Sequence, residues 1–209
     1  MTAPTISATS TTENGVQPTV HAPTDIPSPT VKNVDPFKTT PVDTTVPTAE
    51  PRDYEPGTVG PLGKNELSAC KWNPYDCKRS FSAGDKEMAE SESIKYFPLD
   101  RYSSGDSQQD AARHCIWQGL MTESSNADFA EKMANAHEID KPSGEAAGTM
   151  DMYNNVTGRA IGLRNEGNRA AIISQCVDAA RKAQFWDPKK GPAPAPNGEG
   201  LIYIRRPNS

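Results

Sequence analysis

QQDAARHCIWQGLMT, residues 108–122, is the stretch that decides the fold class of the chain. Asp106 and Ser107 precede it, and both residue types cap helix N-termini. Apolar side chains then recur at helical spacing and form one face of a helix. That face consists of Ala111, Cys115 and Leu120, with Trp117 and Met121 beside it. The stretch therefore predicts a strong helix.

Patterns of the same kind predict further helices on both sides. They extend over about residues 85–96, 127–139, 149–164 and 168–185. Gly-Pro and Asn-Pro pairs mark residues 62–81 as irregular. LIYIRR, residues 201–206, is the one convincing strand pattern, and because a single strand needs a partner, we expect it to pair with a segment of residues 62–81. The sequence thus predicts a mainly α fold, a compact bundle of about four to five helices with a minor β element.

Residues 1–60 have a different composition. They are dominated by Thr, Pro, Ser and Val and contain ten of the 19 prolines of the chain. Such a segment has little apolar surface to bury, so it cannot offset the entropy lost on ordering. We therefore expect a long disordered Thr/Ser/Pro-rich N-terminal tail at residues 1–60 and a folded helical domain at residues 62–209.

Charge and hydropathy exclude several classes of protein. The net charge is -5, the pI is about 5.3 and no basic stripe with interleaved aromatic residues occurs, which argues against binding to nucleic acid. No apolar run approaches the roughly 20 residues that a membrane span needs. The N-terminus also lacks the charged and apolar regions of a classical signal peptide. We therefore expect a soluble protein without a transmembrane segment.

The opening MTAPTISATSTT is rich in Ser and Thr, and the first acidic residue is Glu13. It resembles the uncleaved, unfolded export signals of bacterial type III secreted effectors. On this interpretation the protein is secreted without a classical signal peptide, and its tail binds the secretion machinery or a chaperone of that machinery. The alternative is a generic disordered tail or a linker.

All four cysteines belong to the expected folded part. Cys70 and Cys77 enclose a short loop with a proline turn, a spacing that is compatible with a small disulfide and not with a zinc ribbon. Cys115 and Cys176 lie in two helical patterns, where they either face each other as a second pair or remain buried thiols. A disulfide would place the mature protein in an oxidising space outside the cytosol.

Two of the three histidines lie beside carboxylates in helical patterns. Asp110 and His114 are four residues apart and share a helix face, which allows the carboxylate to fix the tautomer of a general base. Arg113 is adjacent to this pair. His137 and Glu138 are neighbours and point about a hundred degrees apart, so they do not form a pair on their own.

A third polar face lies in MDMYNNVTGRAIG, residues 150–162. Helical spacing places on this side Asp151, Asn155, Gly158 and Gly162, with Asn154 and Arg159 flanking them. Glycine costs roughly 1 kcal/mol in a helix relative to alanine. Its expected benefit here is the close approach of another helix or a ligand.

These three faces lead to the hypothesis of one polar site at about residues 106–165, because a small helical domain has one core and buried polarity is costly unless it is satisfied. We expect the two imidazoles within roughly 10 Å of each other, with Asp151 and Asn155 closing the site. The candidate catalytic residues are His114, Asp110, His137 and Glu138. The candidate substrate-binding residues are Arg113, Asp151, Asn154, Asn155 and Arg159.

The succession of D-A-x-R-H-x-x-W, A-H-E and D-x-x-N-N-x-x-G-R-x-I-G resembles an uncharacterised bacterial helical domain of secreted, toxin-like and phage proteins. The resemblance covers about residues 106–165. It implies a helical fold and an exported context, without a mechanism.

Two functions remain open. The first is an exported effector or toxin-like hydrolase of unknown substrate that acts on a foreign cell or on the cell envelope. Its candidate cofactor is a divalent metal such as zinc, held by His114, His137 and Asp151. The second is a non-enzymatic binding or structural effector in which the polar residues form a helix-packing network. An immunity protein or a host target is the partner that these functions imply. Catalysis requires the polar faces to open onto a cleft, whereas the alternative expects them to be sealed and hydrogen-bonded to each other.

Overall fold

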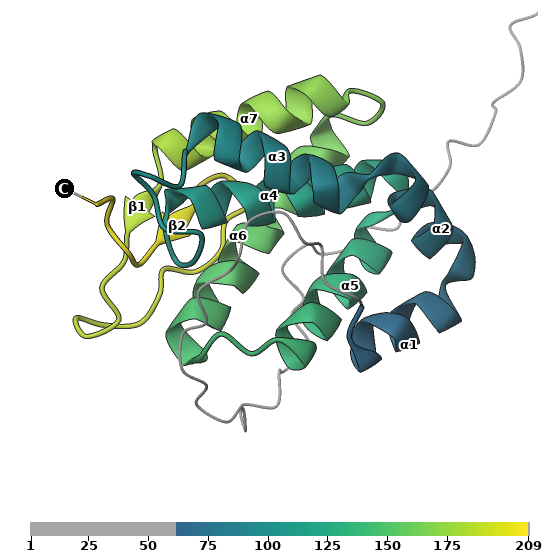
Figure 1. Cartoon of the computed structure of the whole chain (residues 1–209), viewed down its shortest axis with the longest axis horizontal. Coiled ribbons are helices and arrows are strands. Elements are labelled where there is room, and N and C mark those ends of the chain that lie inside the picture. Colours follow the sequence, from purple (N-terminus) through teal and green to yellow (C-terminus); the bar gives the residue numbers. More distant parts are fainter. Residues whose placement is uncertain (1–61, 209) are drawn as a thin grey trace, which may run out of the picture. The chain divides into compact units, whose positions relative to one another are not determined.

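The computed structural model describes residues 62–208, and the predicted disordered tail with its export signal, residues 1–60, lies outside the described residues. The described part is mainly α with a minor β element, as predicted (Figure 1). Its elements are α1 (Lys64–Trp72), α2 (Pro74–Ala83), α3 (Asp85–Tyr96), α4 (Gln108–Ser124), α5 (Ala127–Asp140), α6 (Glu145–Arg164), α7 (Arg169–Arg181), β1 (Gln184–Phe185) and β2 (Ile202–Tyr203). None of the helices in residues 62–208 combines the length and the apolar character that crossing a membrane requires.

The first two helices, α1 and α2, occupy the region that the sequence predicts to be irregular, so this prediction was wrong. Pro74 stands at the first position of α2, where a missing N–H costs no hydrogen bond. The preceding Asn73 ends α1 and donates its side-chain amide to the carbonyl of Ala69 (2.9 Å). The Asn-Pro pair is therefore a helix-to-helix junction. The Cys70–Cys77 disulfide spans this junction.

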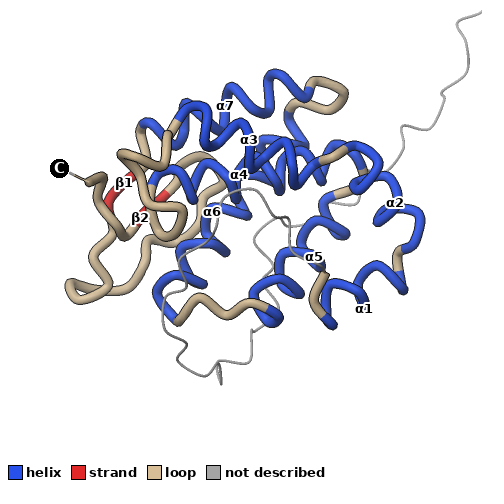
Figure 2. The backbone as a smooth tube through the Cα atoms, viewed as in Figure 1, coloured by secondary structure: helices blue, strands red, loops and turns tan. Residues whose placement is uncertain are grey.

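Helix α4 forms the centre of the described part. It buries 14 of its 17 residues and packs against α2, α3, α5, α6, α7 and β2. Figures 1 and 2 show α4 between the other helices, with α1 and α2 toward one end and the two strands at the other. Ser107 caps the helix by accepting a hydrogen bond from the Gln109 N–H.

Glycines bring α4 and α6 into close contact. A Cβ atom on Gly158 would lie 2.4 Å from the carbonyl oxygen of Cys115, and one on Gly162 would lie 2.6 Å from the carbonyl oxygen of Gly119. Side chains do not tolerate such distances to backbone atoms, so only glycine permits this approach. The expected close approach at the glycine face of residues 150–162 is confirmed, and the partner is α4.

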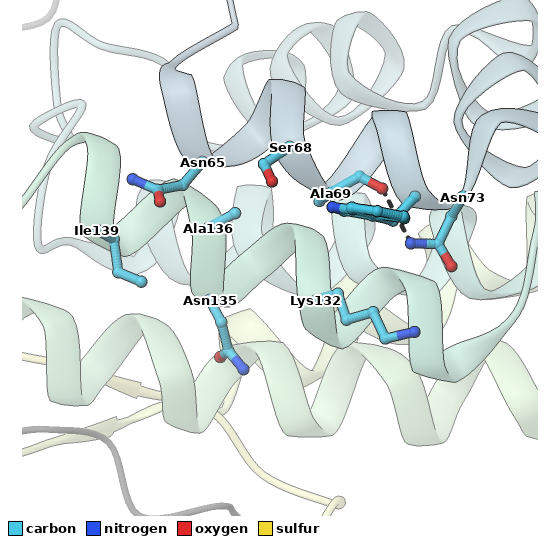
Figure 3. Close-up of a pocket in the computed structure, with 9 residues that line it drawn as sticks. Asn65, Ser68, Ala69, Asn73, Lys132, Asn135, Ala136 and Ile139 are labelled. Carbon is cyan, nitrogen blue, oxygen red and sulfur yellow. Dashed lines mark hydrogen bonds between the residues drawn. The ribbon is translucent and has the colours of Figure 1, made fainter.

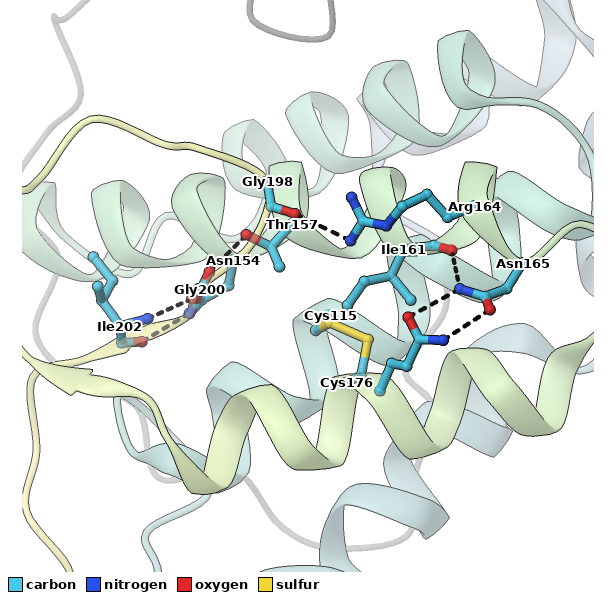
Figure 4. Close-up of a disulfide and its surroundings, with 11 residues drawn as sticks. Cys115, Asn154, Thr157, Ile161, Arg164, Asn165, Cys176, Gly198, Gly200 and Ile202 are labelled. Atoms are coloured by element: carbon cyan, nitrogen blue, oxygen red, sulfur yellow. Dashed lines mark hydrogen bonds between the residues drawn. A yellow bond between two sulfur atoms is a disulfide. The ribbon is translucent and has the colours of Figure 1, made fainter.

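The disulfide Cys115–Cys176 joins the buried side of α4 to α7 (Figure 4). Both cysteines are fully buried. The alternative of two buried thiols, which the sequence left open, is therefore not what the structure contains. Together with Cys70–Cys77, this bond accounts for all four cysteines of the chain.

The two short strands form a parallel pair in which Gln184 lies opposite Ile202 and Phe185 opposite Tyr203. The strand at residues 201–206 was expected to pair with residues 62–81, and this expectation was wrong. Its partner comes instead from the segment that follows α7. That segment was predicted to be helical to residue 185, but α7 ends at Arg181.

Candidate functional site

His114 lies at the junction of α4 and α6 and contacts three polar side chains. Its Nδ1 lies 3.1 Å from Asn155 Oδ1. Its Nε2 lies 3.5 Å from Asp110 Oδ1 and 3.4 Å from Asp151 Oδ1. These four residues, Asp110, His114, Asp151 and Asn155, are called the His114 cluster below. Each of them is at most 5% exposed.

Two helices position this cluster through the same spacing. Asp110 and His114 are four residues apart on α4, and Asp151 and Asn155 are four residues apart on α6, so each pair shares a helix face. The close contact at Gly158 holds the two faces against each other one turn away. The sequence-predicted pairing of Asp110 with His114, closed by Asp151 and Asn155, is therefore present in the structure.

Asp110 is anchored from both sides. Its Oδ2 accepts the backbone N–H of Asp106 (2.7 Å), and its Oδ1 is paired with Arg113. Arg113 also lies 3.7 Å from Glu90 of α3. Burial opposes ionisation of Asp110, but the charges of Arg113 and His114 outweigh it and hold the pKa of this carboxyl below its usual range.

The other titratable groups here have pKa values that are displaced in different directions. Burial lowers the pKa of His114 to about 4, against the attraction of Asp110, so the imidazole is neutral at neutral pH. Burial and the negative charges of Asp110 and Glu138 raise the pKa of Asp151 well above its usual range. Burial, with the charge of Asp110, also raises the pKa of Glu138 to about 8. Neighbouring carboxyl groups thus differ in whether they hold a proton near neutral pH.

Glu138 belongs to α5 and lies close enough to Asp110 and Asp151 for their charges to interact. Its Oε1 is buried and has no hydrogen-bond partner among residues 62–208. A buried carboxyl oxygen without a partner is unusual in folded proteins. This group is therefore a candidate for proton transfer rather than for structure alone.

His137 has a partner of its own. Its Nδ1 lies 2.8 Å from Glu66 Oε1, and burial and this contact act in opposite directions on its pKa, which is lowered overall. Trp117 packs edge-on against both imidazoles, with ring centroids 6.4 Å from His114 and 5.3 Å from His137. The Trp117 indole therefore lies between His137 and the His114 cluster and contacts both imidazoles. The predicted 10 Å separation of the two imidazoles stays a prediction.

The sequence did not reveal Glu66, which is fully buried in α1. Burial opposes its ionisation, but hydrogen bonds from His137 and from the Gly63 N–H lower the pKa of Glu66 to about 2. The only signal in the sequence is the three-residue spacing from Gly63 to Glu66, which suits a helix N-terminus. That signal was missed because the segment was interpreted as irregular.

Two predicted substrate-binding residues are occupied elsewhere. The side-chain amide of Asn154 donates to the Ile202 carbonyl (3.0 Å) and accepts the Ile202 N–H (2.9 Å), so it holds β2 on α6 (Figure 4). Arg159 is buried and donates to Gln118 Oε1 (3.1 Å). The structure therefore does not bring Asn154 and Arg159 to the His114 cluster.

Two grooves of the described surface do not contain the cluster either. One, of about 480 Å³, lies between α1 and α5 (Figure 3). It is lined by Asn65, Ser68, Ala69, Trp72, Asn73, Lys132, Asn135, Ala136 and Ile139. The other, of about 420 Å³, lies beside β1. The cluster is linked to the surface by the exposed Ser143, whose Oγ lies 3.4 Å from Asp151 Oδ2.

Fold and site define a mainly α, disulfide-bonded protein with a buried His–Asp cluster between its two central helices. The model of the family described as "Domain of unknown function (DUF6973)" matches residues 67–184, and the protein belongs to this family. The match begins inside α1 and ends in β1, so it includes all four cysteines and the whole His114 cluster. Searches of the curated proteins and of the solved structures each found no match.

Proposed function

We propose that the protein is an exported, effector- or toxin-like hydrolase whose reaction takes place at the His114 cluster and whose substrate belongs to a foreign cell or to the cell envelope. One observation carries the proposal. Two carboxyl groups from different helices, Asp151 and Glu138, each have a buried oxygen without a hydrogen-bond partner among the described residues. Purely structural networks satisfy such groups, whereas catalytic sites keep them available.

The contacts of His114 suggest a division of roles that differs from the sequence-based one. In a general base, the free imidazole nitrogen must reach the substrate. Here Nε2 faces the carboxylates of Asp110 and Asp151. The proposal therefore assigns proton transfer to Glu138, whose pKa of about 8 lies near neutral pH. Arg113, partly exposed beside Asp110, supplies a positive charge for an anionic or carbonyl group.

Export is supported by the disulfides. Two disulfides in one chain are compatible with an extracellular protein, because reducing conditions in the cytosol normally prevent them. The expected Ser/Thr-rich export signal at the N-terminus is a second, independent reason. Secretion without a classical signal peptide, and a partner such as a secretion chaperone or an immunity protein, remain parts of the proposal.

The alternative function is a non-enzymatic effector in which the polar residues only specify helix packing. The low exposure of the His114 cluster, at most 5% for each member, favours this alternative. It predicts that removing any member of the network lowers stability. The hydrolase proposal predicts instead that at least one member can be replaced with loss of activity and no loss of stability.

The test is a growth assay in which the protein is directed to the periplasm of a test bacterium. The wild-type protein should inhibit growth or cause lysis, and Glu138→Gln should reduce this effect by at least about 100-fold, the usual contribution of a general acid or base. Asp128→Asn, which removes an exposed carboxylate from the same helix, serves as the control and should keep full activity.

Purified protein is then incubated with cell-wall sacculi, phospholipid vesicles and a denatured protein. Release of a soluble product by the wild type, and none by Glu138→Gln, identifies the substrate class. The proposal fails if Glu138→Gln inhibits cells as strongly as the wild type does, or if the wild type neither affects cells nor cleaves any of the three materials.

A further inference from the structure

Three atoms of the His114 cluster converge at distances that do not suit hydrogen bonds. Nε2 of His114 lies 3.4 Å from Asp151 Oδ1 and 3.5 Å from Asp110 Oδ1, whereas N–H···O bonds measure about 2.7–3.2 Å. A tetrahedral zinc ion with ligands at about 2.0–2.1 Å separates neighbouring ligand atoms by roughly 3.3–3.4 Å. One ligand atom from each of Asp110, His114 and Asp151 lies within 4.8 Å of the other two. The two distances from Nε2 thus match edges of a coordination tetrahedron.

The imidazole is oriented as a metal ligand would be. Asn155 Oδ1 is an acceptor, so the contact of 3.1 Å requires a proton on Nδ1 of His114. In the neutral ring this leaves a lone pair on Nε2, the atom that faces both carboxylates. A hydrogen bond to the other ring nitrogen is the usual way in which proteins fix a ligating histidine.

An independent observation points to a missing partner at this position. Asp151 is only 5% exposed, and its Oδ1, the atom closest to Nε2, has no hydrogen-bond partner among residues 62–208. The lone pair of Nε2 and the unpartnered Oδ1 of Asp151 thus face Oδ1 of Asp110, which Arg113 already pairs. A cation between these atoms would satisfy the first two and contact the third.

We propose that Asp110, His114 and Asp151 bind one zinc ion through Oδ1, Nε2 and Oδ1, with Asn155 as the residue that orients the imidazole. Calcium and magnesium prefer oxygen ligands alone, whereas zinc accepts imidazole together with carboxylates. Three protein ligands leave a fourth position open, which is the arrangement of catalytic zinc sites. His137, which the sequence included among the candidate ligands, is replaced by Asp110, because His137 contacts Glu66 instead.

The zinc site deepens the proposed function, because zinc polarises a water molecule for hydrolysis, and in this respect it rests on that proposal. Binding itself can be measured without any substrate.

The experiment uses the oxidised full chain, freed of metal with a chelator, and isothermal titration with zinc chloride. One equivalent should bind to the wild type, and Asp151→Asn and His114→Gln should each weaken binding at least 100-fold. Asp178→Asn, an exposed carboxylate of α7, should bind zinc as the wild type does. Magnesium and calcium chloride at the same concentrations should give no binding.

X-ray absorption of the zinc-loaded protein provides a second readout that does not depend on a variant's folding. The spectrum should show one imidazole, oxygen ligands at about 2.0–2.2 Å and no sulfur near 2.3 Å. Equal zinc binding by the wild type and Asp151→Asn, absence of stoichiometric binding, or a sulfur ligand would overturn the inference.

The two proposals can fail separately. Stoichiometric zinc binding that requires Asp151, together with full activity of Glu138→Gln, would support the metal site and contradict the hydrolase. Loss of activity in Glu138→Gln with no zinc binding by the wild type would support the hydrolase and contradict the metal site.

Discussion

The titratable side chains around His114 differ in their pKa values and therefore in whether they carry a proton near neutral pH. The pKa of Asp110 is low because the charges of Arg113 and His114 and the Asp106 N–H overcome the cost of its burial. The pKa of Glu138 is raised to about 8 by burial and by the charge of Asp110. The folded protein therefore keeps a proton on Glu138 that the unfolded chain loses near the ordinary pKa of 4.5. Folding stability must fall as the pH rises through this window, because the folded state binds the extra proton.

Replacing Glu138 by Gln should remove that pH dependence, since glutamine stays neutral. We expect Glu138→Gln and the wild type to be similarly stable at pH 4.5, and the variant to be more stable above pH 8, by on the order of a few kcal/mol at most. Urea unfolding at pH 4.5, 7 and 9 in the presence of EDTA measures this difference. If the difference in unfolding free energy between the variant and the wild type were the same at all three pH values, Glu138 would not be buried as a neutral acid. A variant that gains stability and loses activity would also argue against the purely structural alternative.

For single residues, the sequence predicts side-chain contacts within one helix but not contacts between segments that are distant along the chain. Asp110 with His114 follows from a four-residue spacing. The contact of His137 with Glu66 spans 71 residues, and no local pattern encodes it. Asn154 was assigned to the site with Asn155 because the sequence does not show how α6 is rotated. In the structure, adjacent residues of α6 face β2 and His114, respectively.

At the scale of elements, the contact between α4 and α6 determines whether the His114 cluster can form. The carbonyl oxygens of α4 occupy the space that side chains at Gly158 and Gly162 would need. Any added methyl group must push the helices apart, and with them the two halves of the cluster. Packing and site geometry therefore depend on the same glycines.

Gly158→Ala should lower the free energy of unfolding by about 1–3 kcal/mol or more, the range for overpacked cores. Gly148→Ala in the same helix is the matched control, because the nearest atom to the added Cβ would be a Glu138 side-chain oxygen at an ordinary 3.8 Å. It should be neutral or stabilising by up to about 1 kcal/mol, the gain in helix propensity. Urea unfolding of both variants tests the contrast, and equal effects would contradict it.

Most helices of the described part could be predicted because their apolar spacing and caps are local. The pattern predicted α3 with the bounds that the structure shows, and Asn126 caps α5 by accepting the Phe129 N–H. Helices α1 and α2 were missed because the Asn-Pro pair was interpreted as the mark of an irregular segment, whereas Pro74 begins α2. The partner of β2 was missed because a pair of two-residue strands carries almost no pattern.

Two disulfides cross-link the described part of the chain, and they differ in the length of chain that they enclose. Cys115 and Cys176 are 61 residues apart, whereas Cys70 and Cys77 are seven apart. A longer loop loses more entropy when it is closed in the unfolded chain, so it stabilises the folded state more. The chain-entropy model gives about 4 kcal/mol for the first bond and about 2.5 kcal/mol for the second.

The double variant Cys115→Ala/Cys176→Ala should therefore be less stable than Cys70→Ala/Cys77→Ala, and by more than the entropy difference, because it also removes two fully buried sulfur atoms. Urea unfolding of the oxidised proteins measures both losses. A reductant should then lower the stability of each double variant only by breaking the one disulfide that this variant retains. A larger loss in the Cys70/Cys77 variant would show that α1 and α2 contribute more than their packing suggests.

The bond between α4 and α7 also makes the segment from Cys115 to Cys176 a covalent ring. This ring contains α5, α6 and the linker of residues 141–144, in which Lys141 and Ser143 are exposed. A protease that cuts this linker leaves His114 on one fragment and Asp151 on the other, yet the fragments remain one molecule. For a protein that is exported among foreign proteases, as proposed, a nicked chain would thus stay assembled until its disulfide is reduced.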